Sequence, residues 1–209
     1  MKRIIGVTGG VGSGKSKVLK ILAEEFGVHV IPADDVAKEL MKPGQEGQRR
    51  VAEYLGEAVL NPDGSINRPA MAQVIFHDEE KRRRVNQLTH PLVWEAIQKE
   101  AEESAASLVA VEAAIVDKEF RDNCQEMWYV YTSRENRRQR LADSRGYSDE
   151  KTSSIIDSQQ TEEEFRRACT HLIDNNGTLE DTRRQICRLL EGNCQTRSGE
   201  PAGSREESK

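Results

Sequence analysis

Apolar residues near the N-terminus fall first in a short continuous run and then at helical spacing. Residues 3–8 (Arg-Ile-Ile-Gly-Val-Thr) form an apolar run that ends in glycines, which is typical of a buried parallel strand. Residues 15–26 place their apolar positions on roughly one helical face, and Gly27 stops that helix. A second apolar run covers residues 28–31. This order of strand, turn, helix and strand predicts the start of a parallel α/β sheet.

The middle of the chain has helical spacing almost throughout. The pattern predicts helices over residues 35–41 and 45–55, a turn at 61–64, a helix from Asp78 to about residue 87, and another with Pro91 in its first turn. We interpret residues 35–106 as one helical insertion between two strands of the sheet.

Strand-like runs return after the insertion. The pattern predicts strands over residues 107–116, 127–131 and 171–173, helices that begin after Ser133, Ser148 and Thr161, and a last helix over residues 179–190. Thr161 and Glu164 have the spacing of a capping box. The composition then changes to Gly, Ser, Glu, Pro and Arg, so we expect a domain over residues 1–191 and a disordered tail over 192–209.

Charge and cysteine content narrow the classes of protein. Lys and Arg number 31 against 36 Asp and Glu, a net charge of −5, which argues against a nucleic-acid-binding protein. The four cysteines lack zinc-finger spacing and indicate reduced thiols in a cytosolic protein. No apolar run is long enough to span a bilayer. We therefore expect a cytoplasmic monomer or small homo-oligomer with no nucleic-acid or membrane partner.

The residues after the first predicted strand carry the clearest chemical motif. Residues 9–16 read Gly-Gly-Val-Gly-Ser-Gly-Lys-Ser and match the phosphate-binding P-loop in full, with a strand before it and a helix after it. Glycines let backbone N–H groups approach phosphate oxygens, and the helix N-terminus favours negative charge. ATP and Mg²⁺ are the expected ligands, and the expected nucleotide-binding residues are Gly12, Ser13, Gly14, Lys15, Ser16 and Lys17.

Each polar residue of this motif has an expected role. Lys15 supplies a positive charge to the β- and γ-phosphates, and the Ser16 hydroxyl is the expected metal ligand. The backbone N–H of Lys17 is positioned for the α-phosphate. A guanine-reading N-K-x-D segment is absent. The short chain and a late Arg-rich segment favour a small-molecule kinase with a closing lid.

Asp34 follows the second predicted strand, where loops of a parallel sheet face the ligand crevice. Its carboxylate is a candidate base for an attacking hydroxyl. Capping the next helix is the alternative role, and the spacing leaves both open.

Further segments occur in a characteristic order along the chain. They are Thr8-Gly9-Gly10, Ala33-Asp34, Thr89-His90-Pro91-Leu92 and Ile173-Asp174-Asn175-Asn176-Gly177. Together they resemble the dephospho-CoA kinase family over about residues 3–190. The resemblance implies a P-loop NTPase core of three layers, α/β/α, and transfer of the ATP γ-phosphoryl group to the ribose 3′-hydroxyl of dephospho-CoA, the final step of coenzyme A synthesis.

The same resemblance implies roles for particular residues. Asp34 would be the catalytic base, and the helical insertion would be the substrate domain. Residues 140–165 would form the lid. The remaining implied positions are Arg140 and Arg145 near the transferred phosphoryl, Asn175 and Gly177 near the adenine, and Thr8, Asp34 and His90 toward the substrate. A structural role for His90 at a helix start is equally open.

Several positions depart from the family pattern. Pro32 stands where an acid is common, Lys17 replaces a Thr, and no arginine lies between residues 146 and 165. Either Asp117 or Glu119 is the equivalent of a family acid. These departures keep two alternatives open: a P-loop kinase for another hydroxyl compound such as a nucleoside, and a nucleotide-binding module without turnover.

Two other groups of residues are interpreted as structural. Arg134, Arg137 and Arg138 fit a solvated helix face better than a set of phosphate ligands. Trp94 and Trp128 each fit an apolar pattern, so we expect both to pack in the core.

Overall fold

A parallel β-sheet forms the centre of the molecule. The computed structural model describes residues 2–195. Its five strands lie in the order β2-β3-β1-β4-β5, and every neighbouring pair is parallel. The strands are β1 (Arg3–Thr8), β2 (His29–Pro32), β3 (Leu108–Glu112), β4 (Glu126–Tyr131) and β5 (His171–Asp174). The predicted parallel α/β fold is confirmed.

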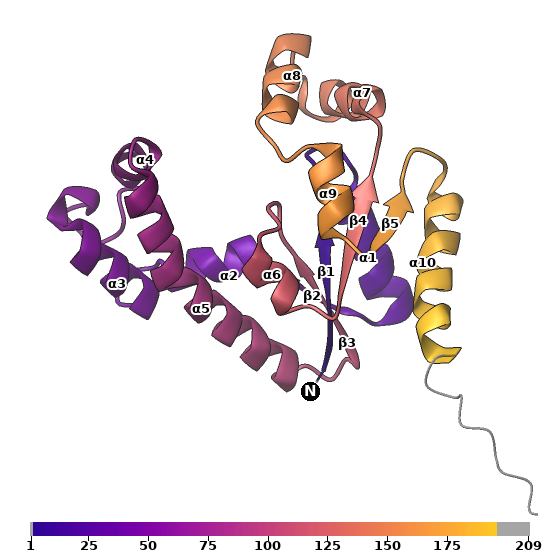
Figure 1. Ribbon diagram of the computed structural model, residues 1–209, viewed down its shortest axis with the longest axis horizontal. Helices are drawn as coiled ribbons and strands as arrows, with labels where there is room; N and C mark the ends of the chain where they lie inside the picture. Colours follow the sequence, from indigo (N-terminus) through magenta and orange to yellow (C-terminus); the bar gives the residue numbers. More distant parts are fainter. Residues whose placement is uncertain (1, 196–209) are drawn as a thin grey trace, which may run out of the picture.

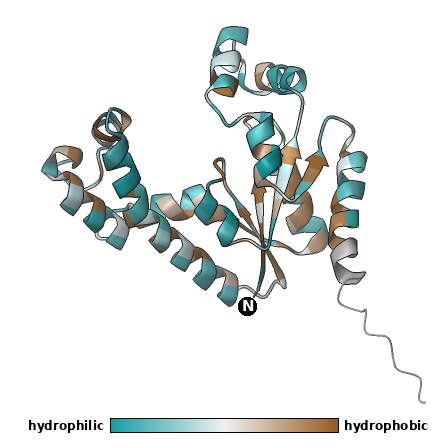
Figure 2. Ribbon diagram, viewed as in Figure 1, coloured by the Kyte–Doolittle hydropathy of each residue, from teal (hydrophilic) through white to brown (hydrophobic). Residues whose placement is uncertain are grey.

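Helices cover both faces of this sheet. Side chains of β1 alternate between two apolar clusters, with Ile4 in one and Ile5 and Val7 in the other, as the period of a strand requires. Helices α1 (Lys15–Phe26) and α10 (Leu179–Gln195) pack on the second cluster. Helices α5 (Glu79–Glu103) and α6 (Lys118–Asp122) pack on the first. The strands are accordingly the most apolar part of the ribbon (Figure 2), and the three layers are as expected.

The order of the strands places a crevice beside β1. The chain leaves β1 for β2 through α1, yet β1 pairs with β3 on one side and β4 on the other; Ile5, for example, pairs with Ala110 and Glu126. Connections on the two sides of β1 therefore run in opposite directions. The carboxyl ends of the strands meet at one edge (Figure 1). A ligand crevice at this point is the general rule for open parallel sheets.

The residues between β2 and β3 form a helical arm beside the sheet (Figure 1). It comprises α2 (Ala33–Leu40), α3 (Glu46–Leu55), the 3₁₀-helix η1 (Glu57–Val59), α4 (Arg68–Phe76) and α5. A second, smaller apolar core holds the outer part of the arm together, with Val51, Val59, Ile66 and Val85 at its centre. Helix α5 belongs to both cores and thereby joins the arm to the sheet.

The predicted helix boundary at Pro91 is wrong. Helix α5 runs without a break through Pro91, although proline cannot donate a backbone hydrogen bond there. Val85 is buried in the core of the arm, whereas Trp94 and Ile97 are buried against the sheet. Burial on both sides of the proline outweighs its local cost.

The region after β3 also differs from the prediction. The strand ends at Glu112, four residues earlier than expected, and residues 118–122 form the short helix α6. The Asp117 carboxylate caps this helix by accepting a hydrogen bond from Phe120 N at 2.8 Å. Such a cap competes with extension of the strand.

The last third of the chain holds α7 (Arg134–Arg145), α8 (Asp149–Asp157) and α9 (Glu162–Ala168). The caps expected at Ser133 and Ser148 are present, and Thr161 forms the expected capping box with Glu164. The first two of these helices lie above the carboxyl ends of the strands (Figure 1).

Helix α10 extends further than the sequence indicated. It continues to Gln195, so the prediction of a tail is wrong for residues 192–195; the remainder of that prediction lies outside the described residues. Leu189 and Leu190 pack against the sheet, and this packing offsets the roughly 1 kcal/mol helix cost of Gly192. Over residues 2–195, no helix has the length and apolar character to span a membrane.

Candidate active site

The P-loop connects β1 to α1 at the crevice. Gly12 and Gly14 adopt left-handed backbone conformations, with φ of 76° and 87°, which glycine adopts without steric cost. Ser13 N donates to Gly10 O at 3.1 Å. Lys15 Nζ donates to Gly9 O at 2.7 Å. The ammonium group of Lys15 therefore lies at the start of the loop.

Several polar groups of the loop are arranged for a ligand. The hydroxyls of Thr8 and Ser13 are buried and have no hydrogen-bond partner among the described residues, which is rare in a folded protein. Ser16 and Lys17 are exposed on the first turn of α1. Unpartnered hydroxyls beneath a glycine-rich loop fit the phosphate site that the motif predicts.

Glu112 is a site residue that the sequence analysis missed. Its carboxylate, at the end of β3, lies 3.6 Å from Lys15 Nζ. Burial lowers the pKa of Lys15, and Glu112 is the main group that opposes this shift. One signal in the sequence was available for Glu112: it is an acid at the end of an apolar strand, and that strand pairs with the P-loop strand.

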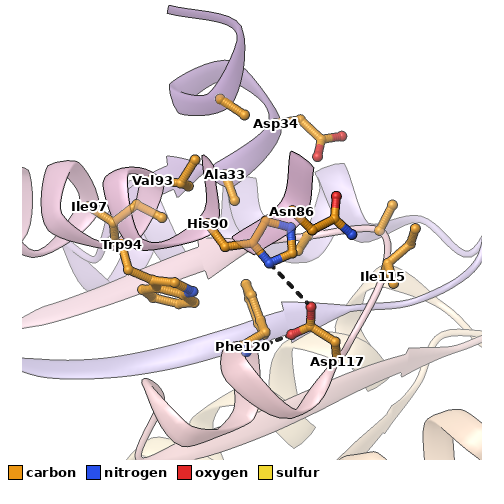
Figure 3. A pocket seen from close by; sticks show the side chains of 13 residues that line it. Ala33, Asp34, Asn86, His90, Val93, Trp94, Ile97, Ile115, Asp117 and Phe120 are labelled. Atoms are coloured by element: carbon orange, nitrogen blue, oxygen red, sulfur yellow. Dashed lines mark hydrogen bonds and ion pairs between the residues drawn. The ribbon is translucent and has the colours of Figure 1, made fainter. Parts of the chain in front are cut away.

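A pocket of about 370 Å³ lies between the helical arm and the sheet. Its lining comes from α2, α5, α6 and the loop after β3, and Trp94 and Phe120 form an apolar wall with ring centroids 5.2 Å apart. Figure 3 shows Asp34 at its edge, on the first turn of α2. The Asp34 charge, like that of Glu112, opposes the lowering of the Lys15 pKa by burial. Asp34 is therefore close to both the pocket and the P-loop.

His90 enters this pocket from α5. Its Nδ1 lies 3.2 Å from Glu119 Oε2 and 3.6 Å from Asp117 Oδ2, and the contact with Asp117 is drawn in Figure 3. Asp117 and Glu119 thus both meet the same imidazole. Asp34 and His90, 56 positions apart in the sequence, line one cavity.

Arg140 and Asn175 support the P-loop from the side of β4 and β5. Arg140 Nη2 donates to Asn175 O at 2.6 Å and its Nη1 to Ser13 O at 3.3 Å. Asn175 Nδ2 donates to Ser13 O at 2.7 Å. Asn175 is only 4% exposed, and a Cβ on Gly14 would collide with its amide. Both residues therefore fix the shape of the loop.

Gly177 and Arg145 lie further out. Gly177 is exposed in the loop that leads to α10. Arg145 is exposed at the end of α7, where its guanidinium lies 5.8 Å from the centre of the Tyr147 ring. The structure thus brings Arg140 to the P-loop but leaves Arg145 away from it.

The interpretation of Arg137 as a solvated residue is wrong. Arg137 is 9% exposed, and its Nε donates to Val11 O of the P-loop at 2.8 Å. Arg134 and Arg138 form the ion pairs of the outer face, with Asp157 and Asp149. Helical spacing groups Arg137 with Arg140 and Leu141 on the face that contacts the loop. Because most residues of α7 are polar, the sequence pattern did not reveal which face of this helix contacts the loop.

Comparisons with known proteins identify the family of this chain. A model of the dephospho-CoA kinase family matches residues 3–181. A dephospho-CoA kinase from Geobacter sulfurreducens is 36% identical over 187 residues, which is 88% of this chain and 94% of that protein. One from Carboxydothermus hydrogenoformans is 33% identical over 192 residues, 90% of this chain and 93% of that protein.

Solved structures show the same architecture. The Thermus thermophilus protein TT1252 has a TM-score of 0.74 and 30% identity, covering 91% of this chain and 97% of its own. A dephospho-CoA kinase from Campylobacter jejuni has a TM-score of 0.61 at 19% identity, covering 94% of this chain and 100% of its own. Shikimate kinase from Acinetobacter baumannii, with a TM-score of 0.52 at 17% identity, covers 92% of this chain and 95% of its own and shares the fold alone.

Proposed function

Because the chain belongs to the dephospho-CoA kinase family, we propose that it transfers the γ-phosphoryl group of ATP to the ribose 3′-hydroxyl of dephospho-CoA, the last step of coenzyme A synthesis. The observation that carries the proposal is the position of Asp34. Its carboxylate lines the pocket and acts electrostatically on Lys15 of the P-loop. A hydroxyl compound bound in the pocket would therefore lie beside a base that is close to the phosphate-binding loop.

Asp34 is the proposed general base. In the proposed step, the 3′-oxygen forms a bond to the γ-phosphorus, the bond from that phosphorus to the β–γ bridging oxygen breaks, and ADP leaves. The Asp34 carboxylate takes the proton of the attacking hydroxyl. Asp34 is exposed in the first turn of α2 and is an acceptor on the pocket side.

The P-loop residues support the binding of a triphosphate. The backbone N–H groups of Gly12 to Lys17 and the Lys15 ammonium are the proposed phosphate ligands. In such transfers, positioning and charge neutralisation account for nearly all of the catalysis. Arg140, Asn175 and Gly177 complete the proposed nucleotide site on the side of β5.

A divalent cation such as Mg²⁺ fits the same place. The described residues contain no cluster of three or more His, Cys, Asp or Glu side chains for a metal, but Mg²⁺ needs only one or two protein groups beside phosphates and water. The exposed hydroxyl of Ser16 and the carboxylate of Glu112 would hold it. When bound, it neutralises charge on the β- and γ-phosphates.

The other implied residues keep their proposed roles. His90, held by Glu119 and Asp117, is proposed to contact dephospho-CoA in the pocket. The buried Thr8 hydroxyl has no hydrogen-bond partner among the described residues, so we propose that it faces the substrate side of the loop. Residues 140–165 are the proposed lid, and its movement would bring Arg145 toward the transferred phosphoryl. A cytoplasmic location and a monomeric or small homo-oligomeric state stay predictions.

One assay tests the proposal directly. Purified protein is incubated with Mg-ATP and dephospho-CoA, and CoA and ADP are quantified by chromatography and mass spectrometry. The two products are expected in equal amounts. A Lys15→Ala variant is the control for contaminating kinases. CoA formation no higher than in this control would refute the proposal. A panel of other hydroxyl compounds, with a nucleoside among them, tests the acceptor, since a preferred nucleoside would contradict the assignment.

A further inference from the structure

Arg137 is a buried cation at the P-loop for which the proposed mechanism has no role so far. Its side chain is 9% exposed. Nε donates to Val11 O at 2.8 Å, and Nη2 donates to Gln159 Oε1 at 2.6 Å. Gln159 Oε1 in turn accepts from Val11 N at 3.0 Å. Arg137 therefore lies directly against the loop backbone.

The guanidinium group covers the first residues of the loop. A Cβ placed on Gly10 would lie 2.5 Å from Arg137 Cζ and 2.7 Å from Nη1, so only glycine leaves room for it. Lys15 Nζ bonds to Gly9 O at the same end of the loop. The charge of Arg137 contributes to lowering the pKa of Lys15. Two positive groups are thus held close together at one place.

The positive charge of Arg137 has no carboxylate partner among the described residues. The flanking arginines on α7 do have one: Arg134 pairs with Asp157 at 2.5 Å and Arg138 with Asp149 at 3.0 Å. Arg137 Nη1 donates no hydrogen bond within the described part of the chain. A buried charge without a counter-charge is costly. Arg137 also repels Lys15, whose charge is compensated only in part by Glu112 at 3.6 Å. An anionic ligand would remove both costs.

We propose that Arg137 is a phosphate ligand that acts with Lys15 on the terminal phosphates of a nucleoside triphosphate. The P-loop lysine of such sites reaches the β- and γ-phosphates, and the Arg137 guanidinium lies close to that lysine. The free Nη1 contacts a terminal oxygen, while the bonds to Val11 and Gln159 keep the guanidinium oriented. Arg137 then stabilises the charge that develops as the γ-phosphoryl group moves to its acceptor.

This proposal rests on the triphosphate site of the proposed function but not on its acceptor. The stretch from residue 146 to 165 contains no arginine, so α8 and the loops on either side of it offer no guanidinium of their own. Arg137 supplies one from α7. A purely structural role, in which Arg137 only holds Gln159 against the loop, is the alternative that the experiment must separate.

Nucleotide binding distinguishes the two roles. Affinities for ATP, ADP and AMP with Mg²⁺ are measured by calorimetry for Arg137→Gln, Arg137→Lys and the matched control Arg134→Gln. Arg137→Gln is expected to weaken the binding of ATP at least tenfold, that of ADP less, and that of AMP hardly at all. Turnover is expected to fall on the order of 10³-fold. Arg137→Lys should retain part of the preference for ATP over ADP. Arg134→Gln, which alters an exposed ion pair, should behave as wild type.

Two further measurements make the test complete. Gln159→Met removes the acceptor of Nη2 but keeps the guanidinium. If it abolishes the preference for ATP over ADP to the same extent as Arg137→Gln, the role is structural and the proposal is overturned. A crystal structure of the wild-type protein with Mg²⁺ and a non-hydrolysable ATP analogue tests it even if Arg137→Gln does not fold. An Arg137 guanidinium beyond hydrogen-bond distance of every phosphate oxygen would also overturn it.

The acceptor does not enter these binding measurements. If the wild type binds ATP with an Arg137-dependent preference yet forms no CoA, the proposed acceptor fails and the role of Arg137 stands. If CoA is formed and Arg137→Gln lowers the affinities for ATP, ADP and AMP equally, the proposed function stands and the role of Arg137 fails.

Discussion

At the scale of single residues, the chemistry of the site depends on charges held close together without full compensation. Lys15 has Glu112 at 3.6 Å and Asp34 within electrostatic reach. Arg137 adds a second cation that has no acid of its own among the described residues. The motif identified Lys15 directly, because the P-loop is a local sequence pattern. Glu112 and Arg137 reach the loop from β3 and α7 through the fold. The end of an apolar strand and the helical spacing were indirect signals for them, and neither signal by itself assigns a residue to the loop.

The role of Asp34 predicts a selective effect of its substitution. Asp34→Asn is expected to reduce turnover on the order of 10²–10⁴-fold, because the amide cannot accept the hydroxyl proton. ATP affinity should change little, since Asp34 lies on the pocket side of the loop. Steady-state kinetics and ATP titration of the same preparation measure both. A matching loss of ATP affinity would instead make Asp34 part of the nucleotide or metal site.

Two buried thiols predict how stability changes with pH. Burial raises the pKa of Cys124 and of Cys169 from 9.0 to about 12. Above about pH 9 the unfolded chain loses these protons while the folded chain keeps them, so the free energy of unfolding falls as the pH rises toward 12. Near pH 7 neither state ionises and the effect is absent.

Urea unfolding at a series of pH values measures this slope. Burial also raises the pKa of Tyr129, from 10.0 to about 12, so the contribution of Tyr129 begins about one pH unit above that of the thiols. The Cys124→Ala, Cys169→Ala double variant should have a flatter profile. Equal slopes for the variant and the wild type would contradict the burial of the thiols.

At the scale of elements, local signals located most helices and strands but misplaced the ends that packing decides. Gly27 ends α1 with φ of 63°, and Thr161 begins α9 with its capping box, because both signals act within a few residues. Pro91 is the opposite case. Its own geometry favours a helix start, but the two cores that bury α5 on either side of it keep the helix continuous. Those cores involve residues far away in the sequence.

Helix α5 should therefore contain a local cost at Pro91. Pro91→Ala restores a backbone donor and is expected to raise the free energy of unfolding by about 1–3 kcal/mol. Turnover should fall, because a change of the backbone at Pro91 moves the neighbouring His90 relative to Glu119. Glu95→Ala, at an exposed position of the same helix, should change stability by less than about 0.5 kcal/mol. A less stable Pro91→Ala protein would show that the proline geometry favours the packing.

At the scale of the whole molecule, the parallel sheet places the P-loop and the pocket at one edge. The fold class followed from the sequence because buried parallel strands and a P-loop have recognisable local patterns. The pocket did not, since its lining residues come from four separate segments between residues 33 and 120. The resemblance to a family indicated Asp34 and His90, but only the packing of α5 beside α2 explains why they share a cavity.

Ligand binding at that edge should stabilise the molecule globally. At a concentration a hundredfold above its dissociation constant, Mg-ATP is expected to add about 2.7 kcal/mol to the free energy of unfolding. For a domain of this size the melting temperature would rise by about 5–10 °C. Thermal denaturation with and without Mg-ATP measures the shift, and Lys15→Ala should lose most of it. An equal shift in that variant would place the nucleotide elsewhere.

The two tryptophans lie in different surroundings, and this gives the protein an internal optical reporter. Trp94 forms part of the pocket wall, whereas Trp128 is fully buried within the sheet and its indole N–H donates to Glu126 at 3.1 Å. Dephospho-CoA entering the pocket should change the fluorescence emission of Trp94 and leave that of Trp128 constant. A Trp94→Phe protein should show no change in fluorescence when dephospho-CoA is added. Binding of the acceptor can therefore be followed by fluorescence in the absence of phosphoryl transfer.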